Sequence, residues 1–462
     1  MDFSRLKRLV HVLAALTIGH IACAQAPAIS GSWWGELNMG MNSLAVSFTI
    51  ETAGGGTATG YMDVPAQGAR GIPVELKKVT PDTLEVNVPS LGAAYGGVRV
   101  TGNLIKGTFV QRGLKLALDL QPGSIPARRP QTPKAPYPYV TEDVTFRNDK
   151  AGAVLSGTLT YPLMHYRYPA GTIPVVLMVT GSGLQDRDET IMDHKPFLVI
   201  ADHLARNGIA SLRYDDRGAG SSDGPVEGTT TADNMEDAEA GIAYLRSLGK
   251  FGKVGVLGHS EGGTIAFMLA GEHAVDFIVS LAGTTIPGSE VLVGQNRALF
   301  LQGGVPAATV DQYVEALKVV YADRTAGVKV EDTREYVDRL CREHGLSLPE
   351  NLRANLELLP TAGGEWMTWF LGYDPSQAIR NIICPVFALN GTHDLQVLSR
   401  DNLPVLRENL QPDQRHRIEE YDSLNHLFQH CTPADAMNYW GIEETISKEV
   451  LEDIAEWVKS VK

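Results

Sequence analysis

The stretch VGVLGHSEGGTIAF (residues 254–267) decides the fold of the longer, C-terminal part of the chain. An apolar run leads into Gly258-x-Ser260-x-Gly262, and an apolar segment of helical character follows. Strand, Gly-x-Ser-x-Gly turn and helix form a nucleophile elbow, which holds a serine hydroxyl above the edge of a sheet. We therefore predict that Ser260 is a nucleophile at a helix N-terminus, where unpaired backbone N–H groups stabilise negative charge.

Apolar runs on both sides of this stretch alternate with helical patterns. Each run is short and almost continuously apolar, as in strands covered on both faces: IPVVLMVTG (173–181), IASLRYDD (209–216), KVGVLG (253–258), VDFIVSLAG (275–283) and CPVFALNG (384–391). The alternation predicts an α/β domain with a doubly wound, mostly parallel sheet over residues 140–462. Residues 287–376 contain helical segments and no convincing strand, so we expect a helical insertion between two sheet strands.

The N-terminal part of the chain has a different periodicity. Apolar residues alternate with polar ones around 44–50, 84–88 and 114–120, and Gly, Pro and Asp turns separate these runs. Period-two alternation is typical of antiparallel strands with one buried face, so residues 28–121 are predicted to be a small all-β domain. Six prolines lie within residues 122–139, where fixed φ angles and missing N–H groups favour an extended linker.

The first 24 residues have the pattern of a secretory signal peptide. Three basic residues precede an apolar run over 9–22, which ends in Ala22-Cys23-Ala24. The run is shorter than a membrane span needs, so we expect cleavage after Ala24 and export to the periplasm or the medium. Anchoring as a lipoprotein through Cys23 is the less favoured alternative, because His20 stands where such signals carry an aliphatic residue.

Composition excludes several classes of partner. The formal net charge of −14 argues against binding to nucleic acid or to an anionic membrane. Four cysteines without a C-x-x-C pair indicate neither a disulfide framework nor a zinc site, and we expect no metal and no cofactor. No later stretch is long and apolar enough to be a transmembrane segment. The oligomeric state is left open.

A serine nucleophile needs a base and a group that orients the base. In hydrolases built on this kind of sheet the order along the chain is Ser, Asp or Glu, then His. His426 lies in a predicted loop, YDSLNHLF (421–428), before the last helix, and is the preferred base; His393 and His430 are the alternatives. Asp394 follows a strand end and is the preferred acid, which would fix the imidazole tautomer and stabilise the imidazolium.

An oxyanion needs two backbone N–H donors. One is predicted to be the main chain of Glu261, the residue after the nucleophile. The other is expected in the loop within VTGSGLQDRDE (179–189), from Ser182 or Gly183. The charged residues of this loop, Asp186, Arg187 and Asp188, are expected to pair with each other and with RYDDRG (213–218), and so to make the loop rigid.

Five motifs, GSGLQDRDE, LRYDDRGAGSSDG, GHSEGG, GTHDLQV and NHLF, occur in this order. With them the chain resembles the EstD-type bacterial carboxylesterases of the α/β-hydrolase superfamily over roughly residues 140–462. The resemblance implies a triad of Ser260, Asp394 and His426, hydrolysis of small-molecule, short-chain acyl esters without a cofactor, and a helical lid at 287–376.

Two other functions stay open. A serine peptidase of the prolyl type shares the sheet and the triad order, although residues 28–121 are too few for the β-propeller that accompanies such peptidases. A glycan-binding or surface-binding protein with a vestigial hydrolase domain would use Trp33 and Trp34 as exposed stacking residues, whereas one buried core tryptophan is the structural alternative. Lid aromatics would either line an acyl pocket or pack internally: Trp366, Trp369, Phe370 and Tyr373.

Overall fold

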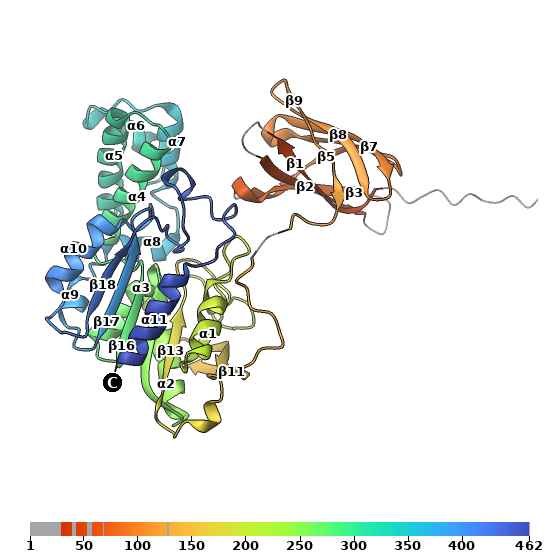
Figure 1. Ribbon diagram of the computed structural model, residues 1–462. Helices are drawn as coiled ribbons and strands as arrows, with labels where there is room; N and C mark the ends of the chain where they lie inside the picture. The colour runs from red at the N-terminus through yellow and green to blue at the C-terminus, as the bar shows by residue number, and fades with distance from the viewer. Residues whose placement is uncertain (1–28, 39–42, 53–57, 68, 127–128, 462) are drawn as a thin grey trace, which may run out of the picture. The chain divides into compact units, whose positions relative to one another are not determined.

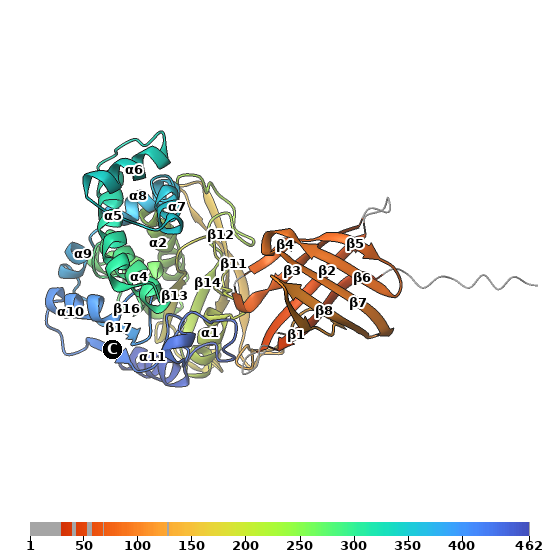
Figure 2. The same cartoon turned by 90° about the horizontal axis from the view of Figure 1, so that it is seen from above.

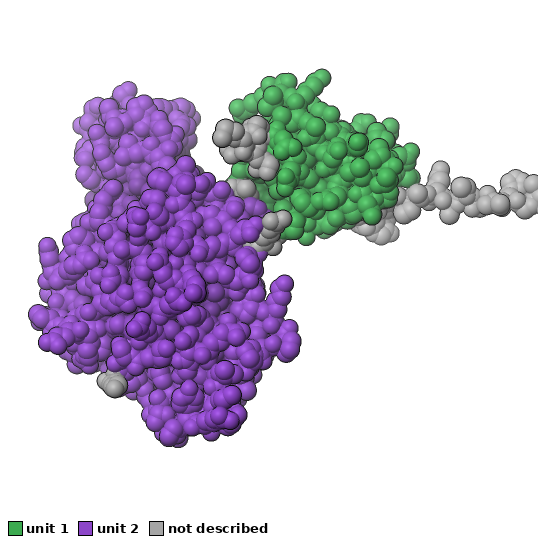
Figure 3. Space-filling view, viewed as in Figure 1, with its two compact units in different colours: residues 1–126 green, residues 127–462 purple. Residues whose placement is uncertain are grey.

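The chain folds into two compact units, residues 1–126 and 127–462 (Figure 3). The computed structural model describes residues 29–38, 43–52, 58–67, 69–126 and 129–461. The division between the units falls inside residues 122–139, the stretch in which the sequence predicts a linker. The predicted signal peptide, residues 1–24, lies outside the described residues.

The first unit contains two antiparallel five-stranded sheets, with the orders β10-β1-β2-β3-β4 and β5-β6-β7-β8-β9. This arrangement confirms a small all-β domain. Trp33 belongs to the core of the unit and is 3% exposed, so it is not an exposed stacking residue. The strands are β1 (Gly31–Asn38), β2 (Ser43–Thr52), β3 (Ala58–Val64), β4 (Ala69–Pro73), β5 (Glu75–Val79), β6 (Thr83–Val88), β7 (Ala93–Thr101), β8 (Leu104–Gln111), β9 (Leu114–Ala117) and β10 (Gln121–Pro122).

The second unit is built on one eight-stranded sheet with the order β11-β12-β14-β13-β15-β16-β17-β18. The strands from β14 to β18 are parallel, and β12 runs antiparallel to both of its neighbours, β11 and β14. This order confirms the mostly parallel sheet. The strands are β11 (Thr141–Asn148), β12 (Ala153–Thr160), β13 (Ile173–Val179), β14 (Ala210–Tyr214), β15 (Phe251–His259), β16 (Phe277–Leu281), β17 (Val386–Gly391) and β18 (Arg417–Tyr421).

Helices cover both faces of this sheet (Figures 1 and 2). One face packs against α2 (Thr231–Ser247) and α3 (Glu261–Gly271), and the other packs against α1 (Pro196–Arg206) and α11 (Lys448–Ser460). Burial of both faces explains why the central strands are apolar throughout. α10 (Ser399–Asn409) lies beside the strands β17 and β18, and the short α9 (Ser376–Arg380) packs against α3 and α10.

The predicted helical insertion lies between β16 and β17. Its five longer helices pack around a hydrophobic core of their own, and the described residues include no strand between these two. The insertion comprises α4 (Gly288–Gln302), α5 (Ala307–Thr325), α6 (Thr333–Glu343), α7 (Glu350–Leu358) and α8 (Gly364–Gly372). An α/β-hydrolase sheet with a helical lid is therefore confirmed.

Candidate active site

The turn between β15 and α3 forces Ser260 into an unusual backbone conformation. Its φ and ψ are 53° and −117°, in the left-handed half of the map that costs a non-glycine residue energy. A Cβ atom at Gly258 would lie 1.9 Å from the carbonyl oxygen of Gly262, and one at Gly262 would lie 2.1 Å from that of Val179. Only glycine therefore lets the strand and the helix approach this closely, which is the geometry of a nucleophile elbow.

Replacing Gly262 with alanine should lower the free energy of unfolding by about 3 kcal/mol or more, because the new methyl group would meet backbone atoms that cannot move aside. Urea denaturation followed by circular dichroism measures the change. Gly372→Ala is the matched control, since a Cβ there meets only a methyl group at 3.7 Å. Equal stability of the two variants would contradict this account of the elbow.

His426 and Asp394 lie together at the carboxyl edge of the sheet. His426 is in the loop after β18, Asp394 is in the turn after β17, and the distance from His426 Nδ1 to Asp394 Oδ2 is 2.8 Å. The other carboxylate oxygen, Oδ1, accepts the backbone N–H groups of Gln396 and Val397 at 2.8 and 2.9 Å. Both side chains are buried. A carboxylate at Nδ1 fixes the tautomer that leaves Nε2 free to accept a proton.

The loop that carries His426 touches the residue before Ser260. His259 Nε2 lies 3.0 Å from the carbonyl oxygen of His426, and the two imidazole centroids are 4.7 Å apart. Among the described residues, no hydrogen bond joins the Ser260 hydroxyl to another side chain. Such bonds are often long in a site without substrate and shorten in the reacting complex.

The alternative bases, His393 and His430, are engaged elsewhere. His393 Nδ1 lies 3.0 Å from the carbonyl oxygen of Cys431. His430 is at the surface, where Nδ1 lies 2.9 Å from a carboxylate oxygen of Glu444. Of the three histidines considered from the sequence, His426 is the one hydrogen-bonded to Asp394.

The three backbone N–H groups considered as oxyanion donors have no acceptor among the described residues: that of Glu261, at the first position of α3, and those of Ser182 and Gly183. The neighbouring Gly181 is excluded, because its N–H donates to Glu189 Oε1 at 2.7 Å. Gly183 has φ 99°, a conformation that favours glycine. The choice between Ser182 and Gly183 stays a prediction.

Ion pairs and hydrogen bonds hold this loop, as expected from the sequence. Arg187 contacts Asp215 at 2.6 Å, and Asp188 pairs with Arg213. Asp216 accepts from the Gln185 N–H and the Thr180 hydroxyl, each at 2.8 Å.

Burial raises the pKa of Asp216 to about 7, and the nearby Glu189 and Glu261 carboxylates add to the rise. The carboxylates of Asp216, Glu189 and Glu261 therefore lie close enough to one another to interact.

A contact that sequence reasoning missed joins α8 of the helical insertion to the residue after Ser260. Trp366 Nε1 lies 3.0 Å from both carboxylate oxygens of the buried Glu261. The Trp366 ring stacks on Phe370 at 5.4 Å, and Trp369 stacks on Tyr373 at 4.5 Å. The lid aromatics therefore pack on one another, and Trp366 also reaches the residue after the nucleophile. The Glu in GHSEGG was the one available signal, because a carboxylate at a buried position needs a partner.

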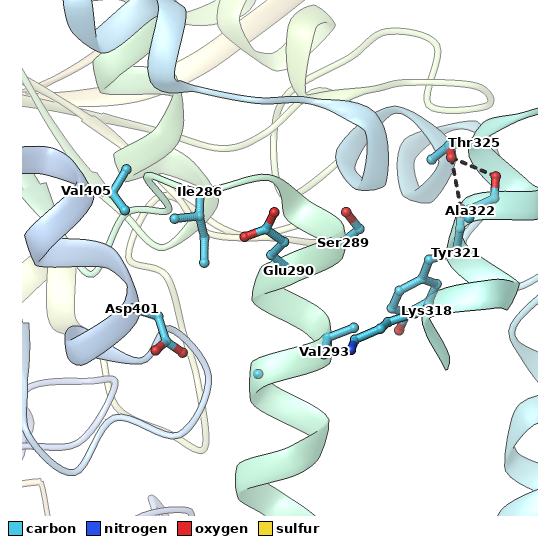
Figure 4. A pocket seen from close by; sticks show the side chains of 11 residues that line it. Ile286, Ser289, Glu290, Val293, Lys318, Tyr321, Ala322, Thr325, Asp401 and Val405 are labelled. Atoms are coloured by element: carbon cyan, nitrogen blue, oxygen red, sulfur yellow. Dashed lines mark hydrogen bonds between the residues drawn. The ribbon is translucent and has the colours of Figure 1, made fainter. Parts of the chain in front are cut away.

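A cavity in this unit lies away from the predicted catalytic residues. It has a volume of about 840 Å³, and side chains of α4, α5 and α10 line it, among them Ser289, Glu290, Lys318 and Asp401 (Figure 4). None of the predicted catalytic residues belongs to its lining. Among the described residues there is no group of three metal-binding side chains, and none of the helices is long and apolar enough to span a bilayer.

Comparison with known proteins places the chain in a family. The family model described as "X-Pro dipeptidyl-peptidase (S15 family)" matches residues 151–419, which is more than half of the chain. The chain belongs to the S15 family. The match includes Ser260 and Asp394 and ends before His426, so the preferred base lies beyond the part that the S15 model describes.

The expected likeness to EstD is also found. The S15-family chain is 26% identical to Esterase EstD of Thermotoga maritima over 327 residues, 70% of this chain and 68% of that protein. Among solved structures it is similar to the Pyrococcus furiosus esterase Pf2001, with 16% identity and a TM-score of 0.43 over 73% of this chain and 98% of that one. Est1E from Butyrivibrio proteoclasticus has 13% identity and a TM-score of 0.38, covering 69% of this chain and 96% of Est1E.

Another buried histidine, His194, packs against the segment that follows His426 in this S15-family chain. His194 is fully buried, and its ring contacts Thr445 Oγ1, the Tyr439 carbonyl and Gln429 Nε2 at 3.0, 2.8 and 3.1 Å. Gln429 lies three residues after His426. Burial lowers the pKa of His194 to about 4.

The low pKa of His194 predicts acid destabilisation. Below pH 6.5 the unfolded chain protonates this histidine and the folded protein does not, so stability falls as pH decreases from 6.5 towards 4. The expected contribution is about 3 kcal/mol, and His194→Gln should remove it from the pH dependence of unfolding. Urea melts at several pH values measure this slope. The exposed His344→Gln serves as control, and an unchanged slope in His194→Gln would refute the assignment.

Proposed function

We propose that this protein is a secreted serine esterase that hydrolyses short-chain acyl esters through an acyl-enzyme intermediate. Ser260 attacks the ester carbonyl, His426 accepts the hydroxyl proton, and Asp394 orients the imidazole. The observation that carries the proposal is the buried 2.8 Å hydrogen bond from His426 to Asp394, in a loop that contacts the residue before Ser260.

The site has groups that can stabilise the negative charge on the carbonyl oxygen and a base that can carry the proton. The carbonyl oxygen becomes negative as the tetrahedral intermediate forms, and the N–H groups of Glu261 and of Ser182 or Gly183 stabilise it. His426 then passes its proton to the leaving alcohol. Water attacks the acyl-enzyme in the second half of the cycle, with His426 again as base. These steps need no metal or cofactor.

The substrate class rests on the relatives. Esterase EstD is named as an esterase, and this chain covers 68% of it. Export rests on residues 1–24, whose basic start, apolar run and Ala-x-Ala end favour a signal peptide. Detection of a mature protein that begins at Gln25 in the periplasm or medium tests the export.

A peptidase of the prolyl type is the second candidate, because the description of the matching family names an X-Pro dipeptidyl-peptidase. Both activities would use the same nucleophile, base and oxyanion donors. They differ in the leaving group, an alcohol in one case and an amine in the other, and in what lies around the acyl group.

One experiment separates the candidates. The purified protein is assayed with p-nitrophenyl esters from acetyl to long chain, with acetylated sugars, and with aminoacyl-proline p-nitroanilides, and Ser260→Ala is the control. We expect the highest kcat/KM on a short ester. A higher kcat/KM on the proline substrates would reverse the assignment. Failure of Ser260 to react with a fluorophosphonate probe in the folded protein would favour a binding protein with a vestigial hydrolase domain.

A further inference from the structure

A second histidine–carboxylate pair, His259 and Glu189, lies next to the proposed triad and has no part in the chemistry described above. Glu189, in the loop after β13, and His259, the last residue of β15, are 1% and 5% exposed. The distance from Glu189 Oε1 to His259 Nδ1 is 2.9 Å. Glu189 has φ 52°, a strained backbone conformation that the surrounding structure must hold.

His259 faces an acceptor at each ring nitrogen. Nδ1 meets the Glu189 carboxylate, and Nε2 lies 3.0 Å from the carbonyl oxygen of His426. A neutral imidazole has one N–H and satisfies one of these acceptors, whereas the imidazolium has two and satisfies both. Burial lowers the pKa of His259, but the Glu189 carboxylate and the hydrogen bonds outweigh burial, and the net pKa is raised.

Charge balance also favours the protonated, imidazolium form of His259. Among the ion pairs of the described residues, Glu189 has His259 as its partner, and its second oxygen, Oε2, is buried without a hydrogen bond. A buried carboxylate without a counter-charge is strongly destabilising. The imidazolium of His259 supplies that charge.

The pair connects three parts of the active site. Glu189 Oε1 accepts the N–H of Gly181 in the oxyanion loop at 2.7 Å. The same oxygen holds His259, which precedes the nucleophile Ser260. Through Nε2, His259 holds the backbone of His426.

We propose that Glu189 and a protonated His259 are positioning residues, which fix the oxyanion loop, the nucleophile turn and the backbone of the general base relative to one another. The proposal rests on the proposed function of Ser260 and His426. A displacement of about 1 Å in such a site costs about 100-fold in rate, so loss of these contacts should lower kcat measurably.

The protonation state is tested without any substrate. In the full-length protein labelled with ¹⁵N-histidine, the His259 signals are assigned by their loss in His259→Gln. We expect both ring nitrogens of His259 to carry protons at pH 7.5, and one of them to lose its proton in Glu189→Gln. A neutral His259 in the unmodified protein would overturn the proposal. This measurement stands even if the protein hydrolyses no ester, an outcome that would refute the proposed function instead.

The positioning role is tested by kinetics on the best ester. Glutamine at 259 keeps a donor where Nε2 lies but removes the charge that faces Glu189, so His259→Gln should lose less of kcat than His259→Leu. We expect His259→Leu and Glu189→Gln to lose about 10-fold to 100-fold in kcat, with KM changed less than threefold. His273→Asn is the matched control, because His273 also contacts a backbone carbonyl, that of Asn381, but at an exposed site. Full kcat in His259→Leu, or equal losses in the Gln and Leu variants, would overturn the role.

Discussion

Replacement of Ser260 by alanine should lower kcat for ester hydrolysis by about 10⁴-fold to 10⁶-fold and leave the fold intact. Without the hydroxyl there is no acyl-enzyme, and the residual rate comes from water attacking a substrate held by the oxyanion donors. The free energy of unfolding should change by less than about 0.5 kcal/mol, since the Ser260 hydroxyl makes no hydrogen bond to a side chain among the described residues.

Two measurements check this prediction together. Steady-state rates give kcat, and mass spectrometry after fluorophosphonate treatment shows whether the probe is attached to residue 260. Ser247→Ala is the control, because Ser247 ends α2 at the surface and bonds only to the nearby Tyr244 carbonyl. A Ser260→Ala protein that keeps more than one per cent of the activity would mean that another group is the nucleophile.

Local features of the sequence were enough to predict the elbow. A Cβ at either glycine around Ser260 would lie about 2 Å from a backbone oxygen, that of Gly262 for Gly258 and that of the distant Val179 for Gly262, so the requirement for glycine shows in the sequence as a five-residue pattern. The buried strands were recognisable for the same reason, because a strand covered on both faces is apolar throughout. His426 and Asp394 followed from their order along the chain and their places after strands, and the structure puts them 2.8 Å apart.

Contacts between distant segments could not be predicted in this way. Glu189 and His259 are 70 residues apart, and Glu261 and Trp366 are 105 apart. Taken alone, none of these four residues indicates its partner, and only the packing of distant segments brings the two members of each pair together. The sequence analysis also missed the antiparallel strands β11 and β12. Buried and exposed residues alternate in β11, and no helix separates it from β12, so the pair differs from the apolar strands that alternate with helices.

Replacement of Asp394 by asparagine should lower kcat by about 10⁴-fold, through the tautomer of His426. Asp394 Oδ1 accepts two backbone N–H groups, those of Gln396 and Val397, and Oδ2 faces His426 Nδ1. An asparagine oxygen would keep the place of Oδ1, because the amide nitrogen cannot accept those two N–H groups. The amide nitrogen would then point at Nδ1.

With the amide nitrogen of the asparagine at Nδ1, His426 can no longer act as the base. An N–H donor at Nδ1 stabilises the tautomer whose proton is on Nε2, and a protonated Nε2 cannot accept the proton of Ser260. KM should stay within about threefold, since Asp394 is buried and binds no substrate in the proposed mechanism. Asp422→Asn, an exposed carboxylate on the neighbouring loop, is the control. If Asp394→Asn kept most of kcat while Asp422→Asn lost it, the tautomer of His426 would not depend on Asp394, and another group would have to orient the base.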